Sequence, residues 1–523
     1  MISPSQLAAL RAQGTSHALL DLRERAAYER GHIYGATSLP RRLLEFRLPQ
    51  LVTAPATPIV VYDDDGTLVA LARPTLAAMG YRAVTPLTGG LDAWRAAGHP
   101  VVQGLNVPSK VFGEQMLHAL KTPEIAPPEL AARIARGDDL VIVDARTPEE
   151  YARGCVPGAW SVPGGELVLR ITDLAPRPDT TIVVHCGGRT RSYIGAESLR
   201  RVGLPNPVVA LRNGTMGWEL AGLTLERGAT RAAPSPSPRS REVAARTAAR
   251  VAKEDGVASV DADELRRAQA QQRERNVVVL DVRSAEEYEA GHVAGATWAP
   301  GGQVVQATDE YIAVRTTRIV LVCDRGERSV MTAAWLRRMG FPEVAVLAGG
   351  LGAWRDGGGA LETGRASPVP FGYDAARARV VTVDPGALPD GSFALNVDAS
   401  DVYGRGHVPG AGWVCRSRLE PRIAALAPTP PVVVTCADGV ASTLAAATLL
   451  DLGYEARVLA GGTRAWEAAG FAVERGLTRL LDEPDDVVLK PYERGRAAME
   501  AYLRWETALD DEGRSPHALL APR

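Results

Sequence analysis

The sequence has few of the features that mark secreted, membrane or nucleic-acid-binding proteins. Its 523 residues include five cysteines, an odd number that is too small for a disulfide framework. The 59 basic residues nearly balance the 61 acidic ones, and no block of like charges forms a basic arm, so nucleic acid is not an expected partner. No run of 18 apolar residues is present, and residues 1–14 lack the pattern of a signal peptide. We therefore expect a cytoplasmic protein without a membrane partner.

Internal repetition is the strongest signal in the sequence. An apolar run that ends near an acidic residue recurs four times, at 18–36, 141–159, 278–296 and 394–411. A second apolar run follows in each copy, at 59–66, 182–189, 319–326 and 432–439. The acid and the end of the second run are 42 residues apart in three copies (Asp21 to Asp63, Asp144 to Cys186, Asp281 to Cys323) and 38 apart in the fourth (Asp398 to Cys436). The chain is interpreted as four copies of one unit.

Each unit has the pattern of an α/β fold. Short β-branched runs alternate with helical patterns such as 192–202 and 331–339. Buried runs separated by helices predict βαβ units, and so a parallel β-sheet that is flanked by helices on both faces. In such a sheet the functional loops lie beyond the carboxyl ends of the strands. The residues directly after the second apolar run are therefore the candidate functional loops.

The repeats predict the domain boundaries, with one linker and one tail. The four units are placed at 1–104, 123–228, 257–363 and 379–475. Between the second and third units, 229–256 is rich in Pro, Ser and Arg, and its first part, 229–241, is expected to be extended or mobile. The tail, 476–523, is expected to be helical over 491–509, and this helix more simply docks on its own chain than forms a dimer.

A cysteine follows the second strand in three of the four copies, at Cys186, Cys323 and Cys436. A tight loop and a helix N-terminus follow each one, and their backbone N–H groups favour a thiolate and a bound anion. The first copy has Asp63 at this position and cannot form a persulfide there. We interpret that copy as structural or regulatory.

Three motifs resemble those of rhodanese domains. They are the Asp-x-Arg-x-x-x-Glu-Tyr-x-x-Gly-His-(Ile/Val)-x-Gly-Ala element, the Cys-x4-Arg loop (CGGRTRS at 186–192) and the terminal Gly-Gly-x-x-x-Trp. The resemblance implies four tandem rhodanese-like domains and a sulfurtransferase that moves sulfane sulfur from a donor such as thiosulfate to a thiophilic acceptor through a cysteine persulfide. The acceptor is expected to be a thiol, a cyanide-like nucleophile or a protein persulfide acceptor, and no metal or organic cofactor is implied.

Two alternatives stay open at this point. Phosphatases and arsenate reductases related to this family carry Cys-x5-Arg, one residue longer, so oxyanion chemistry of that kind fits the loop less well. The other alternative is a persulfide carrier or sensory scaffold for a protein partner, which the non-cysteine first copy favours.

Local charge ranks the loops. CGGRTR carries two positive charges, CDRGER none net, CADGVA one negative charge and DDDGTL three. Because positive charge lowers a thiol pKa and attracts anions, Cys186 is the predicted main nucleophile. Arg191 is expected to bind the donor anion and Arg189 to add charge. The predicted substrate-binding residues are Gly187, Gly188, Arg189, Thr190 and Arg191 at this loop, and Arg325 and Arg328 beside Cys323. Cys436 is expected to be weak because Ala441 replaces the arginine.

Other recurring residues have simpler interpretations. Asp21, Asp144 and Asp281 are expected to cap a helix and pair with the arginine two residues later. The histidines of the Gly-His element (His32, His292 and His407) are expected to make structural hydrogen bonds, and His185 to point away from the loop. Cys155 replaces that histidine in the second copy and is read as a small buried substitute. We hypothesise that Cys415 forms a disulfide with Cys436.

Overall fold

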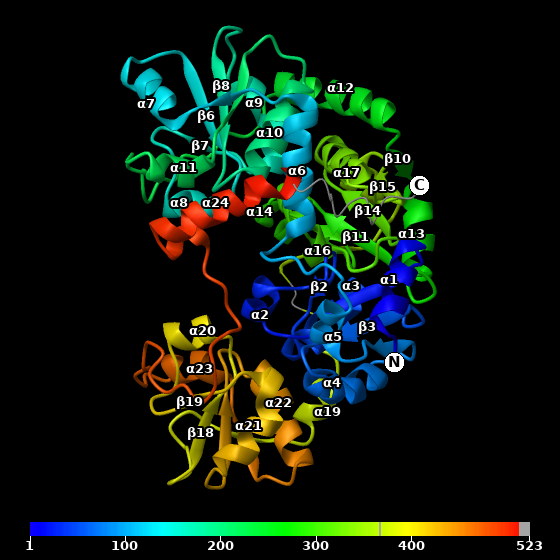
Figure 1. Cartoon of the computed structure of the whole chain (residues 1–523), viewed down its shortest axis with the longest axis vertical. Helices are drawn as coiled ribbons and strands as arrows, with labels where there is room; N and C mark the ends of the chain where they lie inside the picture. Colours follow the sequence, from blue (N-terminus) through cyan, green and yellow to red (C-terminus); the bar gives the residue numbers. More distant parts are fainter. Residues whose placement is uncertain (366–367, 512–523) are drawn as a thin grey trace.

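Each repeat folds around its own parallel β-sheet. The structure is a computed structural model and describes residues 1–365 and 368–511 (Figure 1). The second repeat has the strand order β5-β9-β8-β6-β7, and the third and fourth have the same order, β10-β15-β14-β11-β13 and β17-β21-β20-β18-β19. The first repeat has β2-β1-β3-β4, and a single parallel bridge from Ile2 to Leu87 takes the place of a fifth strand. The predicted α/β fold is confirmed.

The strands are short. The strands of the first repeat are β1 (Ala18–Asp21), β2 (Thr37–Ser38), β3 (Ile59–Tyr62) and β4 (Val84–Pro86). Those of the second are β5 (Glu124–Ile125), β6 (Leu140–Asp144), β7 (Trp160–Ser161), β8 (Thr181–His185) and β9 (Val208–Leu211). The third has β10 (Ala258–Val260), β11 (Val277–Asp281), β13 (Thr297–Trp298), β14 (Arg318–Val322) and β15 (Val344–Leu347), with a small antiparallel pair, β12 (His292–Val293) and β16 (Leu361–Glu362). The fourth has β17 (Val381–Val383), β18 (Phe393–Asn396), β19 (Gly412–Trp413), β20 (Val432–Thr435) and β21 (Ala456–Leu459).

Helices cover both faces of each sheet. In the second repeat, α9 (Leu167–Leu174) and α10 (Thr190–Arg200) pack on the face that carries Val143 and Val184. The opposite face, with Ile142 and Val183, is covered by α7 (Pro127–Ala135), α8 (Pro148–Arg153) and α11 (Gly214–Leu220). Because side chains alternate along a strand, the continuous apolar runs in the sequence serve both faces.

The other repeats carry equivalent helices. The first has α1 (Pro4–Ala12), α2 (Arg25–Arg30), α3 (Leu44–Leu51), α4 (Thr67–Ala78) and α5 (Gly90–Ala96), and α6 (Val107–Leu120) leads to the second. The third has α13 (Ala262–Ala270), α14 (Ala285–Ala290), α15 (Gly301–Gln306), α16 (Thr308–Tyr311), α17 (Glu327–Arg338) and α18 (Gly350–Asp356). The fourth has α19 (Tyr373–Arg377), α20 (Ser400–Arg405), α21 (Leu419–Leu426), α22 (Val440–Asp451) and α23 (Gly462–Ala468).

The repeats associate in two pairs through the same structural segment. Each unit has a turn after the edge strand β2, β7, β13 or β19. In three units this turn is a 3₁₀ helix: η1 (Arg41–Leu43), η2 (Gly164–Glu166) and η3 (Arg416–Arg418). In the second and third repeats η2 meets α15, where a Cβ on Gly165 would lie 3.3 Å from Gly301 Cα. In the first and fourth, η1 meets η3, and Arg41 Nη1 donates to Glu420 Oε2 over 2.8 Å.

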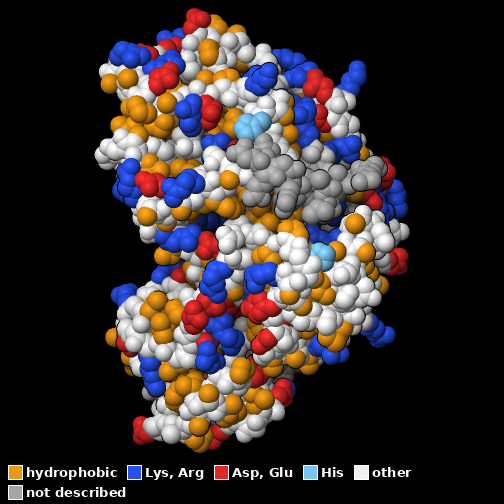
Figure 2. All heavy atoms as spheres, viewed as in Figure 1, with side chains coloured by type: hydrophobic (Ala, Val, Ile, Leu, Met, Phe, Trp, Pro, Cys, Tyr) orange, Lys and Arg blue, Asp and Glu red, His pale blue; other side chains and the backbone are white. Residues whose placement is uncertain are grey.

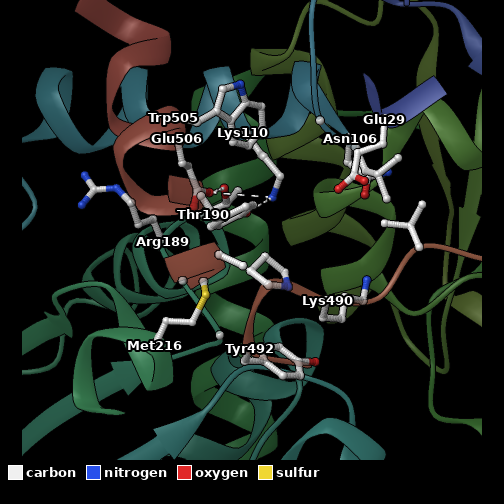
Figure 3. Close-up of a pocket in the computed structure, with 18 of the residues that line it drawn as sticks. Glu29, Asn106, Lys110, Arg189, Thr190, Met216, Lys490, Tyr492, Trp505 and Glu506 are labelled. Atoms are coloured by element: carbon white, nitrogen blue, oxygen red, sulfur yellow. Dashed lines mark hydrogen bonds and ion pairs between the residues drawn. The ribbon is translucent and has the colours of Figure 1, made fainter. Parts of the chain in front are cut away.

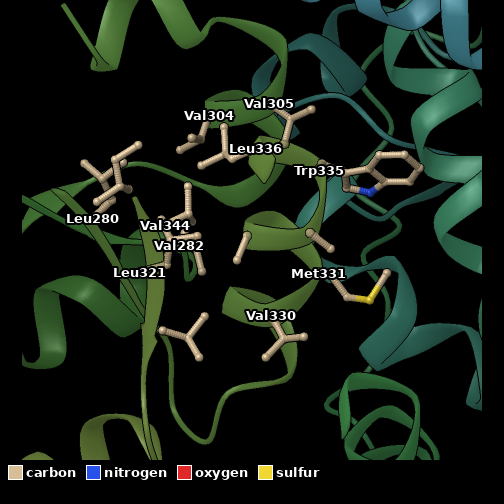
Figure 4. Close-up of a cluster of buried hydrophobic side chains, with 14 of the residues drawn as sticks. Leu280, Val282, Val304, Val305, Leu321, Val330, Met331, Trp335, Leu336 and Val344 are labelled. Carbon is tan, nitrogen blue, oxygen red and sulfur yellow. The ribbon is translucent and has the colours of Figure 1, made fainter. Parts of the chain in front are cut away.

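In the segment between the second and third repeats, residues 229–237 form no helix, and only 238–241 of the stretch expected to be extended belong to the helix that follows. Its helix α12 (Pro238–Asp255) begins after Ser237, whose side chain accepts from Ser240 N. Ala244, Ala248 and Val251 are spaced for one helix face and are buried in a core shared with α9 and α17. Figure 4 shows part of this core, with Trp335 and Met331 of α17 facing the second repeat.

Strand register corrects the alignment of the fourth repeat. Asn396, at the end of β18, pairs with Thr435 as Asp144 pairs with His185 in the second repeat. Asn396, rather than Asp398, therefore occupies the position of the recurring acid. Asp398 takes the position of Arg146, so this unit has lost both members of the pair. The two residues missing from the repeat lie between His407 and Cys436.

Among residues 1–365 and 368–511, no helix is long and apolar enough to cross a membrane. Basic and acidic side chains are interspersed on the face of the molecule in Figure 2.

Candidate functional site

The four candidate loops occupy the same place in the four sheets. Asp63, Cys186, Cys323 and Cys436 directly follow β3, β8, β14 and β20, and each is followed by a helix. A glycine at the start of the last helix of each unit closes over the loop. In the second repeat this is Gly214, with φ of +54°, where a Cβ would lie 2.2 Å from Cys186 O. Side chains larger than hydrogen are therefore excluded where the backbone touches the predicted nucleophile.

Cys186 is enclosed and hydrogen bonded. It is 2% exposed, and Ser192 Oγ of α10 donates to its sulfur over 3.1 Å. The loop itself is fixed by Thr215 N, which donates to Cys186 O over 2.8 Å, and by Met216 N, which donates to Gly187 O over 3.0 Å. The sulfur therefore lies at the N-terminal end of α10 on a loop that α11 holds in place.

Arg191 is placed by a carboxylate. Its Nη1 and Nη2 donate to Glu150 of α8 over 2.6 and 2.9 Å, which is a two-point ion pair with little exposure. Burial alone would raise the pKa of Glu150, but Arg191 lowers it to about 2. The pKa of Arg191 is raised despite its burial, because Glu150 and the Cys186 sulfur lie nearby. The guanidinium stays charged near the sulfur, with two of its five N–H donors bound to Glu150.

Arg189 was expected to add positive charge to the cavity, but its guanidinium is bound elsewhere. Its Nε and Nη2 each donate to Glu114 of α6 over 2.7 Å, and its Nη1 donates to Asn213 over 2.9 Å. Figure 3 shows its guanidinium directed away from the middle of the cavity. Arg189 therefore joins the loop to α6, and the loop charge counted from the sequence is largely neutralised by carboxylates from other segments.

The C-terminal tail lies over this loop. Its helix α24 (Arg496–Asp511) packs against α6 and α11, and Met499 and Leu503 are buried against Met216 (Figure 1). Thr190 Oγ1 donates to Glu506 Oε1 over 3.0 Å. A Cβ on Gly188 would lie 3.1 Å from Glu506 Oε2, so this glycine allows the close approach of the tail. The helix thus docks on its own chain.

A cavity of about 660 Å³ forms between the Cys186 loop, the tail and the first repeat. Six basic and three acidic side chains line it: Arg30, Lys110, Arg189, Arg191, Lys490 and Arg494, and Glu29, Glu150 and Glu506. In Figure 3, Lys490 and Tyr492 lie across the cavity from Lys110 and Glu506. Three buried polar atoms in its wall, Tyr492 Oη, Gln306 Oε1 and Glu506 Oε2, lack a hydrogen-bond partner within the described ranges. Of these, only the Tyr492 hydroxyl can donate, so the cavity can offer basic charge and this hydroxyl to a small anion.

The third repeat arranges its loop differently. Cys323 Sγ accepts from Gly326 N over 3.2 Å and lies 3.2 Å from Ser329 Oγ. Arg328 donates to Glu287, Asp324 and also Glu166 of the second repeat, and its side chain is 2% exposed. The expected second donor site thus has an arginine already bound to three carboxylates. Arg325 is exposed and lines a groove beside α12.

The other two loops have no arginine at the position of Arg191, where Leu68 and Ala441 stand. Burial and the Asp398 carboxylate raise the pKa of the Cys436 thiol. In the first repeat, the carboxylate oxygens of Asp63 accept from Gly66 N over 2.5 Å and from Val69 N over 3.0 Å. The N–H groups of this loop therefore bind a carboxylate of the chain itself. A loop of this shape can thus donate backbone hydrogen bonds to an anionic group at this position.

Several sequence interpretations are settled by contacts. Asp21, Asp144 and Asp281 each form a buried ion pair with the arginine two residues later, at 2.6 to 2.7 Å. The Nδ1 atoms of His32, His292 and His407 each lie 2.8 to 2.9 Å from a tyrosine carbonyl, as expected for structural histidines. His185 is fully buried with its Nε2 3.7 Å from Asp144.

The disulfide hypothesis is wrong in this structure. All five cysteines are free thiols. Cys155 is buried in the core, where a small side chain fits. Cys415 Sγ donates to Glu24 Oε1 of the first repeat over 3.2 Å, so it belongs to the contact between the first and fourth repeats.

The sequence analysis missed the residues that complete the cavity. One signal was available: Glu150 and Glu287 stand in the two copies that have Cys-x4-Arg, whereas Ala27 and Val402 stand in the copies that lack the arginine. The carboxylate and the arginine therefore occur together. The tail residues gave no such signal, because they lie outside the repeat and are about 300 residues from Cys186.

Comparison with known proteins identifies the units. The rhodanese-like domain profile matches residues 3–97, 126–221, 261–356 and 388–469. The chain belongs to the rhodanese-like family. A crystal structure of thiosulfate sulfurtransferase from Pseudomonas aeruginosa superposes with a TM-score of 0.92 at 40% identity, covering 98% of each chain. The arrangement of all four rhodanese domains is thus shared with a solved structure.

Curated relatives agree with this assignment. A thiosulfate sulfurtransferase from Azotobacter vinelandii is 31% identical over 245 residues, which are 39% of this chain and 89% of the relative. A sulfurtransferase from Allochromatium vinosum is 33% identical over 102 residues, 20% of this chain and 92% of the relative. The alignment with the first relative thus has the length of two of the four repeats, and the alignment with the second has the length of one. The chain is a rhodanese-type sulfurtransferase.

Proposed function

We propose that this rhodanese transfers sulfane sulfur from a small anionic donor such as thiosulfate to a thiophilic acceptor, through a persulfide on Cys186. The observation that carries the proposal is the placement of Cys186 in a cavity with an excess of basic side chains. The charged Arg191 and the N-terminal end of α10 lie near the sulfur, and the thiolate is the nucleophilic form of cysteine.

The reaction has two steps. The Cys186 thiolate attacks the outer sulfur of thiosulfate, a new S–S bond forms, and the bond to the sulfonate sulfur breaks, so that sulfite leaves with the electron pair. A nucleophile such as cyanide or a thiolate then attacks the terminal persulfide sulfur, and the Cys186 thiolate is released. Ser192 Oγ, 3.1 Å from the sulfur, stabilises the thiolate in both steps.

The other repeats serve this site in different ways. Because Asp63 stands at the cysteine position, the first repeat cannot form a persulfide there. The role of this repeat is to contribute Arg30 and Glu29 to the cavity wall. Cys323 is a secondary thiol because Arg328 is bound to three carboxylates. Cys436 is weak because Asp398 lies beside it.

The enclosure of Cys186 favours small acceptors over a docked protein. The sulfur is 2% exposed, and α24 lies over its loop. A persulfide carrier for a protein partner would need a more open thiol. The acceptor is therefore a thiol or a cyanide-like nucleophile that can enter the cavity.

Mass spectrometry after brief exposure to thiosulfate tests the proposal. The Cys186 peptide is expected to gain the mass of one sulfur atom, and thiocyanate production from cyanide is expected to be lost in Cys186→Ser and largely retained in Cys323→Ser and Cys436→Ser. If thiocyanate production persists in Cys186→Ser, the assignment of the nucleophile is wrong. If no cysteine gains sulfur from thiosulfate or an organic polysulfide, the enzymatic proposal fails.

A further inference from the structure

The arginines of the Cys186 loop are already bound to carboxylates of the protein. Arg191 is paired with Glu150 at 2.6 Å, and Arg189 is paired with Glu114 at 2.7 Å. Two further cations of the cavity are also engaged, Lys110 by Tyr502 and Arg494 by Glu29. A doubly charged donor therefore needs a cation that is still available.

Lys490 of the tail meets this need. It lines the cavity, is exposed to it, and makes no ion pair with any residue that the structure describes. It belongs to a segment that adjoins the Cys186 loop, because a Cβ on Gly187 would lie 3.9 Å from Tyr492 Cε1. Partial loss of hydration lowers the pKa of Lys490, and a bound anion would oppose this shift.

The segment that carries Lys490 is held at both ends of the cavity. The 3₁₀ helix η4 (Pro491–Glu493) follows it directly. Glu493 accepts from Arg153 of the second repeat over 2.5 Å, and Arg494 Nη2 donates to Glu29 of the first repeat over 2.7 Å. These contacts join the tail to two repeats and hold Lys490 between them. Its position is thus a property of the assembled chain and not of one domain.

Arg30 is the other cation of the cavity wall without an ion pair among the described residues. It lies at the end of α2 in the first repeat and is exposed. Lys490 differs because the segment that carries it adjoins the Cys186 loop, whereas Arg30 belongs to the first repeat. Tyr492 Oη, two residues away, offers an unpartnered hydrogen-bonding atom in the same wall.

We propose that Lys490 binds the oxyanion end of a small sulfane-sulfur donor, such as the sulfonate oxygens of thiosulfate, in the Cys186 cavity. This inference rests on the proposed function, because it assigns the donor contact of that same site. Arg191 and Arg189 then act mainly as positioning residues that fix the loop, and the tail is a working part of the site.

Calorimetry on the full chain separates binding from transfer. Thiosulfate binding is measured on Cys186→Ala, which cannot accept sulfur, and on the same protein with Lys490→Met added. The second variant is expected to bind thiosulfate about tenfold more weakly or worse, as for the loss of one charge-assisted hydrogen bond. Lys490→Arg should keep most of the affinity. The matched control is Lys253→Met on α12, an exposed lysine outside the cavity, which should change nothing.

Kinetics supply a readout that a merely structural role would not change. With Cys186 intact, Lys490→Met is expected to raise KM for thiosulfate and to leave KM for an uncharged organic polysulfide unchanged. The inference is overturned if Lys490→Met binds thiosulfate within about twofold of its parent, or if both donors are affected equally. Failure of the proposed function would look different, since Cys186 would gain no sulfur while thiosulfate binding still depended on Lys490.

Discussion

Substitution of Gly214 by alanine tests whether the backbone of the Cys186 loop sets the activity. The glycine has φ of +54°, and an added Cβ would lie 2.2 Å from Cys186 O and 2.8 Å from Gly188 O. Both contacts are with backbone atoms, which cannot rotate away as a side chain would. The loop that carries the nucleophile must therefore move if the alanine is to fit.

Two effects set the expected magnitude. An alanine in the left-handed region costs about 1–2 kcal/mol by itself. Gly222→Ala isolates this cost, because Gly222 has φ of +78° and nothing lies within 4 Å of its Cβ position. In Gly214→Ala the overlap adds a shift of the loop of about 1 Å, and a misplacement of this size costs about 100-fold in rate. Gly214→Ala should thus lose both more stability and far more activity than Gly222→Ala.

Thiocyanate production at low temperature and calorimetric unfolding measure the two effects on the same samples. A second control comes from the fourth repeat, where a Cβ on Gly462 would lie 2.1 Å from Cys436 O. Gly462→Ala should lose stability to a similar extent and keep its turnover, since Cys436 is not the proposed nucleophile. The reasoning is refuted if Gly214→Ala matches Gly222→Ala in both measurements, or if Gly462→Ala loses turnover as Gly214→Ala does.

Three further predictions concern single charged groups. Arg191 holds the pKa of Glu150 at about 2, below its unfolded value of about 4.3, so Glu150→Gln should cost on the order of 3 kcal/mol at neutral pH in urea unfolding, and this difference should vanish as pH falls from about 4.5 to about 2. Burial raises the pKa of Asp309 to about 6, so the folded chain loses stability as pH rises from about 4 to about 6; Asp309→Asn should stabilise it above that range and not below, and equal effects at both ends would contradict this. Asp398→Asn should lower the pKa of Cys436, measured as a shift of its alkylation rate profile to lower pH; an unchanged profile would exclude Asp398 as a cause.

The repeat pattern predicts most of the fold because it reports burial. Helices cover both faces of each sheet, so the central strands must consist of apolar residues in every unit. The same apolar runs therefore recur along the sequence. The repeat pattern gives no sign of α12, which lies outside the repeats, although Ala244, Ala248 and Val251 form a buried stripe on this helix. In the fourth unit, strand register rather than residue type shows that Asn396 is the equivalent of Asp144.

The candidate nucleophile follows from the sequence, but the charge around it does not. A loop is local, so its cysteine and arginines can be read from consecutive letters. Their ion-pair partners are distant in the chain: Glu114 and Glu150 lie 75 and 41 residues from Arg189 and Arg191. Counting charges within the loop therefore overstates the positive field at Cys186.

The surroundings of the loops, more than the loops themselves, distinguish the four units. Backbone N–H groups donate to Cys323 Sγ and Cys436 Sγ, and in the first repeat they bind the carboxylate of Asp63. At Cys323 the arginine is shared among three carboxylates, one of them from the neighbouring repeat. At Cys186 the first repeat and the tail supply cations and close a cavity. A repeat that has lost its own chemistry can still be required for activity, because it forms part of the wall of another repeat's site.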